Sequence, residues 1–154
     1  MNGFRDKDKS KKNNSKNSMR DFKAALDEAL KFHSAGNISE AIKNYNFLLN
    51  RGFNDPLLFA NYGNILKGLG KLKDAELSYR KAIEMKCKIA EVHSNYGTIL
   101  RDLGKLKDAE LSYRKAINLK PDFAELHFNL GSTLKDLGKL KDAELSFRKA
   151  IDLK

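Results

Sequence analysis

The sequence predicts an all-α protein built as a solenoid of about four helix-turn-helix repeats. A 14-residue segment, GKLKDAELSYRKAI, occurs at Gly70–Ile83 and again at Gly104–Ile117. It returns at Gly138–Ile151 with Phe147 in place of tyrosine. The copies begin 34 residues apart, and self-similarity at such a period is typical of arrays in which small helical units stack on one another. Apolar residues in each unit also follow helical spacing.

The period divides the chain into a tail, residues 1–20, and a repeat domain, residues 21–154. The predicted repeats are 22–55, 56–89, 90–123 and 124–154. The first repeat is the weakest copy, although Gly36, Ala41 and Tyr45 lie 34 positions before their counterparts in the second. We interpret it as a divergent N-terminal cap, as is usual for terminal repeats.

The tail is rich in Lys, Asn and Ser and contains seven Lys/Arg against two Asp, a charge of +5. It has no periodic apolar positions with which to offset the entropy cost of ordering, so we expect a disordered basic tail. Such a tail acts either as a solubilising leader or as an arm for nucleic acid or an anionic membrane surface.

The first helix of a repeat is clearest within residues 90–123. His93, Tyr96, Gly97 and Leu100 fall at i, i+3, i+4 and i+7, which is one stripe of an amphipathic helix. Gly104 is then expected to end this helix, because glycine readily adopts the left-handed conformation found after a helix C-terminus.

The second helix presents Ala109, Tyr113, Ala116 and Ile117 on one face. Small residues at Gly97 and Ala109 are expected to let the two helices approach closely, and Pro121 ends the unit. On the outer face we expect i,i+4 ion pairs, each worth about 0.2–0.5 kcal/mol: Glu76–Arg80, Glu110–Arg114 and Glu144–Arg148.

These residues resemble the signature of the tetratricopeptide repeat family. The signature occurs as Phe59-x2-Tyr62-Gly63-x2-Leu66…Ala75-x3-Tyr79, as His93-x2-Tyr96-Gly97-x2-Leu100…Ala109-x3-Tyr113…Pro121, and as His127-x2-Leu130-Gly131-x2-Leu134…Ala143-x3-Phe147. Repeat one departs from it at Glu28 and Ala29, and Cys87 replaces the expected proline. The resemblance implies a right-handed superhelix whose first helices line a concave groove that binds an extended peptide or a partner helix.

Candidate groove residues lie beside the apolar stripe of each first helix. Asn61, Asn95 and Asn129 occupy equivalent positions, and an asparagine amide offers the donor and acceptor needed to bind a peptide backbone. This row resembles the repeat arrays of O-linked N-acetylglucosamine transferases, in which asparagines grip extended polypeptide. Alternatively, the asparagines bond only their own helices or solvent. The neighbouring candidates are Asn64, Thr98 and Ser132, followed by Lys67, Arg101 and Lys135.

The basic trio of Lys67, Arg101 and Lys135 favours an acidic ligand, although Asp102 and Asp136 adjoin two of its members. A carboxylate clamp for chaperone C-termini is not expected, because Leu26 and Leu30 stand where a lysine and an asparagine would be needed. The alternative functions are a recognition or assembly part of a glycosyltransferase-like or other transferase system, and, less favoured, nucleic-acid binding.

Catalytic and metal-binding motifs are absent from the sequence. His93 and His127 occupy the aromatic position of the repeat and are assigned to helix packing, and His33 has no partner at metal-ligand spacing. Cys87 lies at a repeat junction between two lysines, where we read it as a substitution for proline. No phosphate-binding glycine loop or nucleophile motif occurs. We therefore expect no enzyme activity, no cofactor and no metal.

The composition fits a cytoplasmic protein of 154 residues, 41% hydrophobic and 32% charged, with a net charge of +10. One cysteine excludes an intramolecular disulfide, and neither an apolar segment long enough to span a membrane nor a secretory signal is present. Because no further repeat follows in this sequence, we expect four apolar residues of the final repeat to lack a covering neighbour: Leu137, Leu140, Ala143 and Ile151. We expect self-association through that end, or related chains that continue into another domain, such as a transferase.

Overall fold

The structure, a computed structural model, describes the backbone of residues 3–154 and the side chains from residue 19 onward. Its described part contains eight α-helices and no strand, which confirms the all-α prediction. The helices form two compact units, Met1–Asn54 and Asp55–Lys154.

The first unit consists of α1 (Gly3–Ser34) and α2 (Ile38–Asn50), which pack against each other. Gly36 takes a left-handed φ of 75° in the turn that reverses the chain. Ala29, Ala41 and Tyr45 are fully buried between the two helices. The rings of Phe22 and Phe53 lie 5.2 Å apart.

Helix α1 includes most of the segment for which the composition predicts disorder. The helix begins at Gly3, so the backbone of the tail differs from that expectation. Lys and Arg favour the helical conformation, and adding a residue to an existing helix needs no new nucleation step. Residues 1 and 2 lie outside the described residues.

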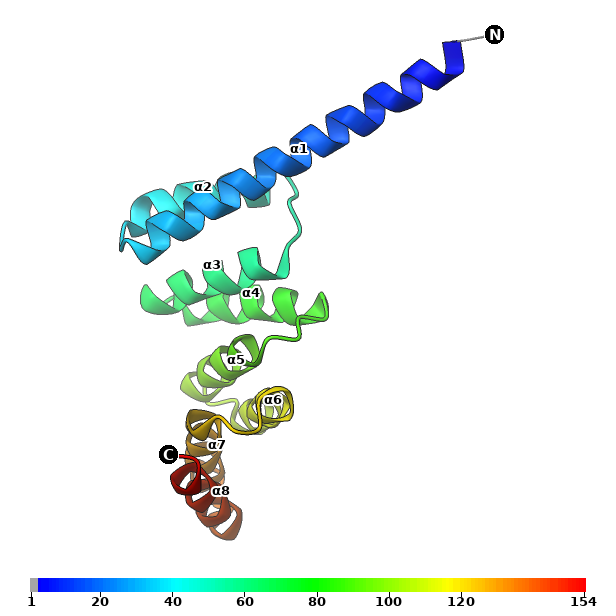
Figure 1. The fold of residues 1–154 in the computed structure, drawn as a ribbon. Helices are drawn as coiled ribbons and strands as arrows, with labels where there is room; N and C mark the ends of the chain where they lie inside the picture. Colours follow the sequence, from blue (N-terminus) through cyan, green and yellow to red (C-terminus); the bar gives the residue numbers. More distant parts are fainter. Residues whose placement is uncertain (1–2) are drawn as a thin grey trace. The chain divides into compact units, whose positions relative to one another are not determined.

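The second unit contains three helix pairs, which Figure 1 shows following one another from α3 to α8. Their bounds are α3 Pro56–Gly68, α4 Leu72–Glu84, α5 Ala90–Asp102, α6 Leu106–Leu119, α7 Ala124–Asp136 and α8 Leu140–Asp152. Each pair falls within one of the predicted repeats, and each helix packs against the next one along the chain. Gly104 has a φ of 74° after α5, as predicted for a residue that ends this helix.

Close approach within a pair depends on a helical glycine. A Cβ built on Gly97 would lie 3.0 Å from the ring of Tyr113, and one on Gly63 would lie 3.0 Å from the ring of Tyr79. Ala109 is fully buried on the facing helix. The predicted close approach of the two helices at Gly97 and Ala109 is confirmed.

The core continues from one pair into the next. Leu100, Ala109 and Tyr113 of the second pair form one cluster with Leu130 and Leu134 of α7. Further along the same junction, Leu126 of α7 packs with Ala116 of α6 and Ala90 of α5. Leu126, Leu130 and Leu134 are therefore a row at i, i+4 and i+8 that covers α6.

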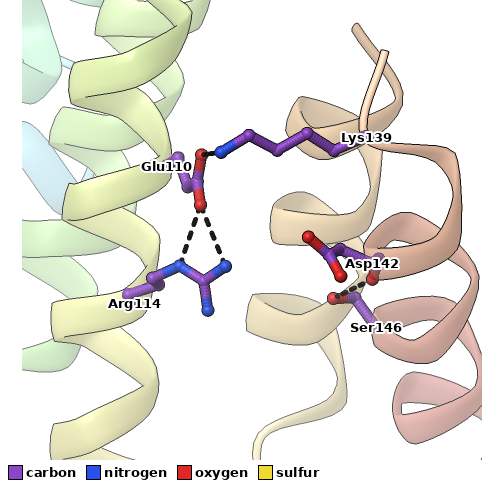
Figure 2. Close-up of polar contacts among 5 residues, drawn as sticks. All are labelled: Glu110, Arg114, Lys139, Asp142 and Ser146. Carbon is purple, nitrogen blue, oxygen red and sulfur yellow. Dashed lines mark hydrogen bonds and ion pairs between the residues drawn. The ribbon is translucent and has the colours of Figure 1, made fainter. Parts of the chain in front are cut away.

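Ion pairs also join successive repeats, and these were not predicted. The Lys139 ammonium donates to Glu110 Oε2 at 2.7 Å, and Figure 2 shows that the other oxygen of Glu110 faces Arg114. Arg114 Nη2 donates to that oxygen, Oε1, at 2.9 Å. One repeat earlier, the Lys105 ammonium lies 2.6 Å from Glu76 Oε1.

The expected pairs within helices are correct in two repeats and wrong in one. Glu110–Arg114 and Glu144–Arg148 form as predicted, at 2.9 and 2.7 Å. The Glu76–Arg80 prediction is wrong, because Glu76 receives Lys105 of the next repeat and Arg80 instead lies 3.7 Å from Glu84. The Lys105 ammonium donates to both oxygens of Glu76, whereas Lys139 uses one oxygen of Glu110 and leaves the other to Arg114.

Candidate functional site

The predicted groove residues occupy three equivalent positions on each of α3, α5 and α7, and we call them the polar ladder. Within a helix the three positions are i, i+3 and i+6, which share one face. All are half-buried except Lys135, which is exposed. The ladder comprises Asn61, Asn64 and Lys67 on α3, Asn95, Thr98 and Arg101 on α5, and Asn129, Ser132 and Lys135 on α7.

The three equivalent asparagines have different surroundings. Asn61 donates its amide to the Leu57 carbonyl of its own helix at 2.8 Å. Asn95 donates to Asn64 Oδ1 of the preceding repeat at 3.2 Å, which links α5 to α3. Asn129 forms no side-chain hydrogen bond within the part of the chain that the structure describes. Its amide is therefore available to a ligand.

Buried tyrosines support the ladder from behind. The Tyr79 hydroxyl of α4 donates to Asn64 Oδ1, so that Asn64 accepts from two groups. Burial raises the pKa of Tyr79, and a hydrogen bond with Asn95 offsets part of that increase. This phenol stays protonated at neutral pH and holds the two amides in place.

The same support recurs at Thr98, whose Oγ1 lies 2.9 Å from the hydroxyl of Tyr113. Thr98 Oγ1 also donates to the Ser94 carbonyl at 3.2 Å, so it accepts the proton of Tyr113. In the last repeat Phe147 has no hydroxyl, and Ser132 donates instead to the Phe128 carbonyl at 3.1 Å.

Charged groups border the ladder on two sides. Lys67, Arg101 and Lys135 lie toward the C-terminal ends of the three helices, and none of them joins an ion pair of the described residues. A hollow of about 190 Å³ opens near the N-terminal ends of α5 and α7, where Glu91 and Glu125 line it. The face is therefore basic along one edge and acidic along the other.

Comparison with known sequences identifies the repeats. A family profile described as TPR repeat matches residues 97–138, and one described as Tetratricopeptide repeat matches residues 58–86 and 124–154. Together these matches cover more than half of the chain. The chain belongs to the tetratricopeptide repeat family. No curated protein matches it significantly over its sequence.

Solved TPR structures share the fold at low sequence identity. A crystal structure of MamA is 19% identical with a TM-score of 0.78, and the alignment covers 92% of this chain and 83% of MamA. YrrB is 21% identical with a TM-score of 0.80, and the alignment covers 84% of this chain and 67% of YrrB. A TPR protein from Parabacteroides merdae is 21% identical with a TM-score of 0.76, over 88% and 54% of the two chains.

The histidines at the TPR aromatic position bond the loop that precedes their own helix. His93 Nε2 lies 3.2 Å from the Cys87 carbonyl, and His127 Nε2 lies 2.7 Å from the Pro121 carbonyl. Burial lowers the pKa of His93, so the ring is neutral at pH 7 and donates through Nε2. This geometry agrees with their assignment to helix packing.

Among the residues that the structure describes, no group of three or more His, Cys, Asp or Glu side chains is arranged to hold a metal ion. His33 contacts Tyr45 through an edge-on ring contact at 6.5 Å between centroids.

No described helix combines the length and apolar character needed to cross a membrane.

Sequence reasoning missed a large groove on the last TPR. It has a volume of about 810 Å³ and is lined by Asp122, Phe123, Ala124, Glu125, Phe128, Phe147, Ala150, Ile151, Leu153 and Lys154. Of the four residues predicted to lack cover, Leu140 and Ile151 are 67% and 70% exposed. Leu137 is half-buried, and the prediction is wrong for Ala143, which packs inside its own pair. The phenylalanine at position 128, where the earlier repeats have Ala60 and Ser94, is the signal that could have revealed this groove.

Proposed function

We propose that this TPR protein is a non-catalytic interaction module whose polar ladder binds an extended polypeptide. The observation that carries the proposal is the hydrogen bond from Asn95 to Asn64, which places polar groups of α5 and α3 side by side on the face of the ladder. An extended peptide exposes a donor or an acceptor at each residue, and amides can satisfy either group. Binding of this kind reads the backbone and tolerates many side chains.

The asparagines alone do not supply enough affinity. A net hydrogen bond contributes roughly 0.5–1.5 kcal/mol, so three amides contribute only a few kcal/mol. A micromolar complex requires about 8 kcal/mol. The remaining free energy and the selectivity come from the side chains beside the amides, in particular the two charged edges.

The basic edge favours acidic residues in the bound segment. Because Lys67, Arg101 and Lys135 are not engaged by described carboxylates, a ligand carboxylate does not have to displace an existing ion pair. On the acidic edge, by contrast, Glu91 is already in an ion pair, because its Oε1 lies 3.0 Å from the ammonium of Lys120. We therefore assign selectivity to the basic edge.

One structural relative agrees with this use of the fold. YrrB is described as a TPR protein with an unusual peptide-binding site. Peptide binding by a TPR protein of the same fold supports a peptide-binding function for this chain.

The test compares capture of polypeptides from nuclease-treated lysate by the intact protein and by an Asn61/Asn95/Asn129→Ala variant. A matched variant, Asn46/Asn50/Asn118→Ala, replaces three exposed asparagines outside the ladder. Captured segments are then synthesised and titrated, with helicity checked by circular dichroism. We expect at least tenfold weaker binding only for the ladder variant, and equal binding by all three proteins would overturn the proposal.

Selectivity is tested by reversing the basic edge. A Lys67/Arg101/Lys135→Glu variant is expected to bind acidic segments at least tenfold more weakly and to lose the salt dependence of that binding. Unchanged binding of acidic segments would remove the charge preference while leaving the ladder proposal intact.

A further inference from the structure

A second hollowed surface lies on the last repeat and includes no residue of the polar ladder. We call it the terminal groove, the 810 Å³ groove between the start of α7 and the end of α8. The rings of Phe128 and Phe147 lie 5.5 Å apart there, and Phe128 and Ile151 are 56% and 70% exposed. Large apolar side chains gathered at one exposed place are typical of an interface.

The chain itself shows what covers such a face. Ala109, Tyr113, Ala116 and Ile117 of α6 correspond to Ala143, Phe147, Ala150 and Ile151 of α8. On α6, Tyr113 and Ala116 are fully buried, because α7 packs over them. The corresponding residues of α8 therefore form the same kind of face as the one on α6, against which a helix packs.

The covering helices share one spacing. Leu126, Leu130 and Leu134 are followed by Lys139, and the positions are i, i+4, i+8 and i+13. The helix that covers α4 has the same spacing, with Val92, Tyr96 and Leu100 followed by Lys105. Three apolar residues on one helical stripe pack on the face below, and the lysine beyond the helix reaches a glutamate.

Glu144 is the glutamate that such a lysine would reach. Its counterpart Glu110 uses one oxygen for Arg114 and the other for Lys139 (Figure 2). Glu144 Oε1 accepts from Arg148 at 2.7 Å, and Oε2 accepts no hydrogen bond from the described residues. The apolar face of α8 and the Oε2 acceptor of Glu144 thus correspond to the face of α6 and the Glu110 oxygen that contact α7 and Lys139 one repeat earlier.

We propose that the terminal groove docks an amphipathic α-helix of a partner protein, with apolar residues at i, i+4 and i+8 and a lysine at i+13. The apolar stripe packs on Phe147 and Ile151, and the lysine donates to Glu144. This surface does not include the polar ladder, so the proposal stands independently of the proposed peptide binding.

The probe is a fluorescent peptide of residues 122–141, held helical by a side-chain staple on its outer face. The staple is needed because a free helix of this length is marginal in water. Anisotropy titration of the full chain is expected to show saturable binding. Ile151→Asp is expected to weaken it at least tenfold, whereas Leu111→Asp, at an exposed leucine of α6, leaves it unchanged.

The ion pair is tested from both sides. Glu144→Gln in the protein and Lys139→Glu in the peptide are each expected to weaken binding by about twofold to fivefold, as for a partly exposed charge pair. The Asn61/Asn95/Asn129→Ala variant is expected to bind the peptide normally, which separates this site from the ladder.

Absence of saturable binding by the stapled peptide overturns the proposal, as does equal binding by Ile151→Asp in a chain of unchanged helicity. Sedimentation of the chain without peptide tests the other possible occupant of the groove, a second copy of the chain. Self-association that Ile151→Asp abolishes would assign the terminal groove to a second copy and would also overturn the partner helix.

Discussion

The contact between Gly97 and the ring of Tyr113 gives a quantitative test of how the helix pairs are held. In Gly97→Ala, the new Cβ would lie 3.0–3.1 Å from three ring carbons. Carbon atoms prefer separations of about 3.5–4.0 Å, so the helices or the ring must move. Tyr113 is fully buried and its hydroxyl bonds Thr98, which leaves the ring little room.

Two opposing effects set the magnitude. Overpacking a filled core costs about 1–3 kcal/mol, whereas replacing glycine by alanine within a helix gains about 1 kcal/mol. We expect Gly97→Ala to lower the free energy of unfolding by about 1 kcal/mol. Gly68→Ala is the matched control, because nothing lies within 4 Å of its added Cβ and only the helical gain remains.

Urea denaturation followed by circular dichroism compares the two variants with the parent chain. Midpoints should move in opposite directions, lower for Gly97→Ala and higher for Gly68→Ala. Gly131→Ala should be milder than Gly97→Ala despite its shorter contact of 2.8 Å, because Phe147 is only half-buried and its ring can turn. A Gly97→Ala chain as stable as the Gly68→Ala chain would refute the steric reasoning.

Three further outcomes follow from the polar contacts. Glu110→Gln should lower the free energy of unfolding by about 1–2 kcal/mol in urea titrations, because a buried carboxylate loses its charge. Glu144→Gln should lower it by less than about 0.5 kcal/mol, because this carboxylate is exposed. Equal effects of the two substitutions would contradict the cross-repeat pairing. Burial lowers the pKa of His93 below its ordinary 6.5, so the unfolded chain binds the proton first as the pH falls. Stability should therefore decrease as the pH drops below 6.5, and His93→Gln should flatten this part of a thermal-stability profile. Tyr113→Phe should cost about 1 kcal/mol in thermal denaturation by removing the bond to Thr98, and an unchanged midpoint would show that water replaces the hydroxyl there.

Much of the fold is predictable because duplication makes the pattern explicit. The stripe containing Tyr96 and Gly97 has helical periodicity in repeats two to four, and Gly104 marks a turn that requires a positive φ. The start of α1 could not be predicted in this way. Composition indicates whether a segment can form a core of its own, but it does not indicate whether a helix that begins elsewhere continues through that segment. The helical backbone from Gly3 is therefore not evident from Lys and Asn content.

The candidate site was predictable as a row of positions but not as a set of interactions. Equivalent positions of Asn61, Asn95 and Asn129 follow from the period, whereas their different hydrogen bonds depend on what the neighbouring repeat places beside them. Lys105 and Glu76 are 29 residues apart, too far for the i,i+4 rule to relate them. A contact between repeats emerges only when the packing of two units is known.

The pairing of a glutamate with a lysine from the following repeat has a consequence for how such arrays change length. Repeats two to four each carry the equivalent lysine and, five residues later, the equivalent glutamate, which in repeats two and three pairs with the lysine of the repeat that follows. Inserting a second copy of residues 90–123 would therefore create one more complete junction, with no compensating substitution elsewhere. In a linear array each added unit contributes its own stability and one more interface. Recombination between copies can thus lengthen or shorten the array while every remaining junction keeps its partners.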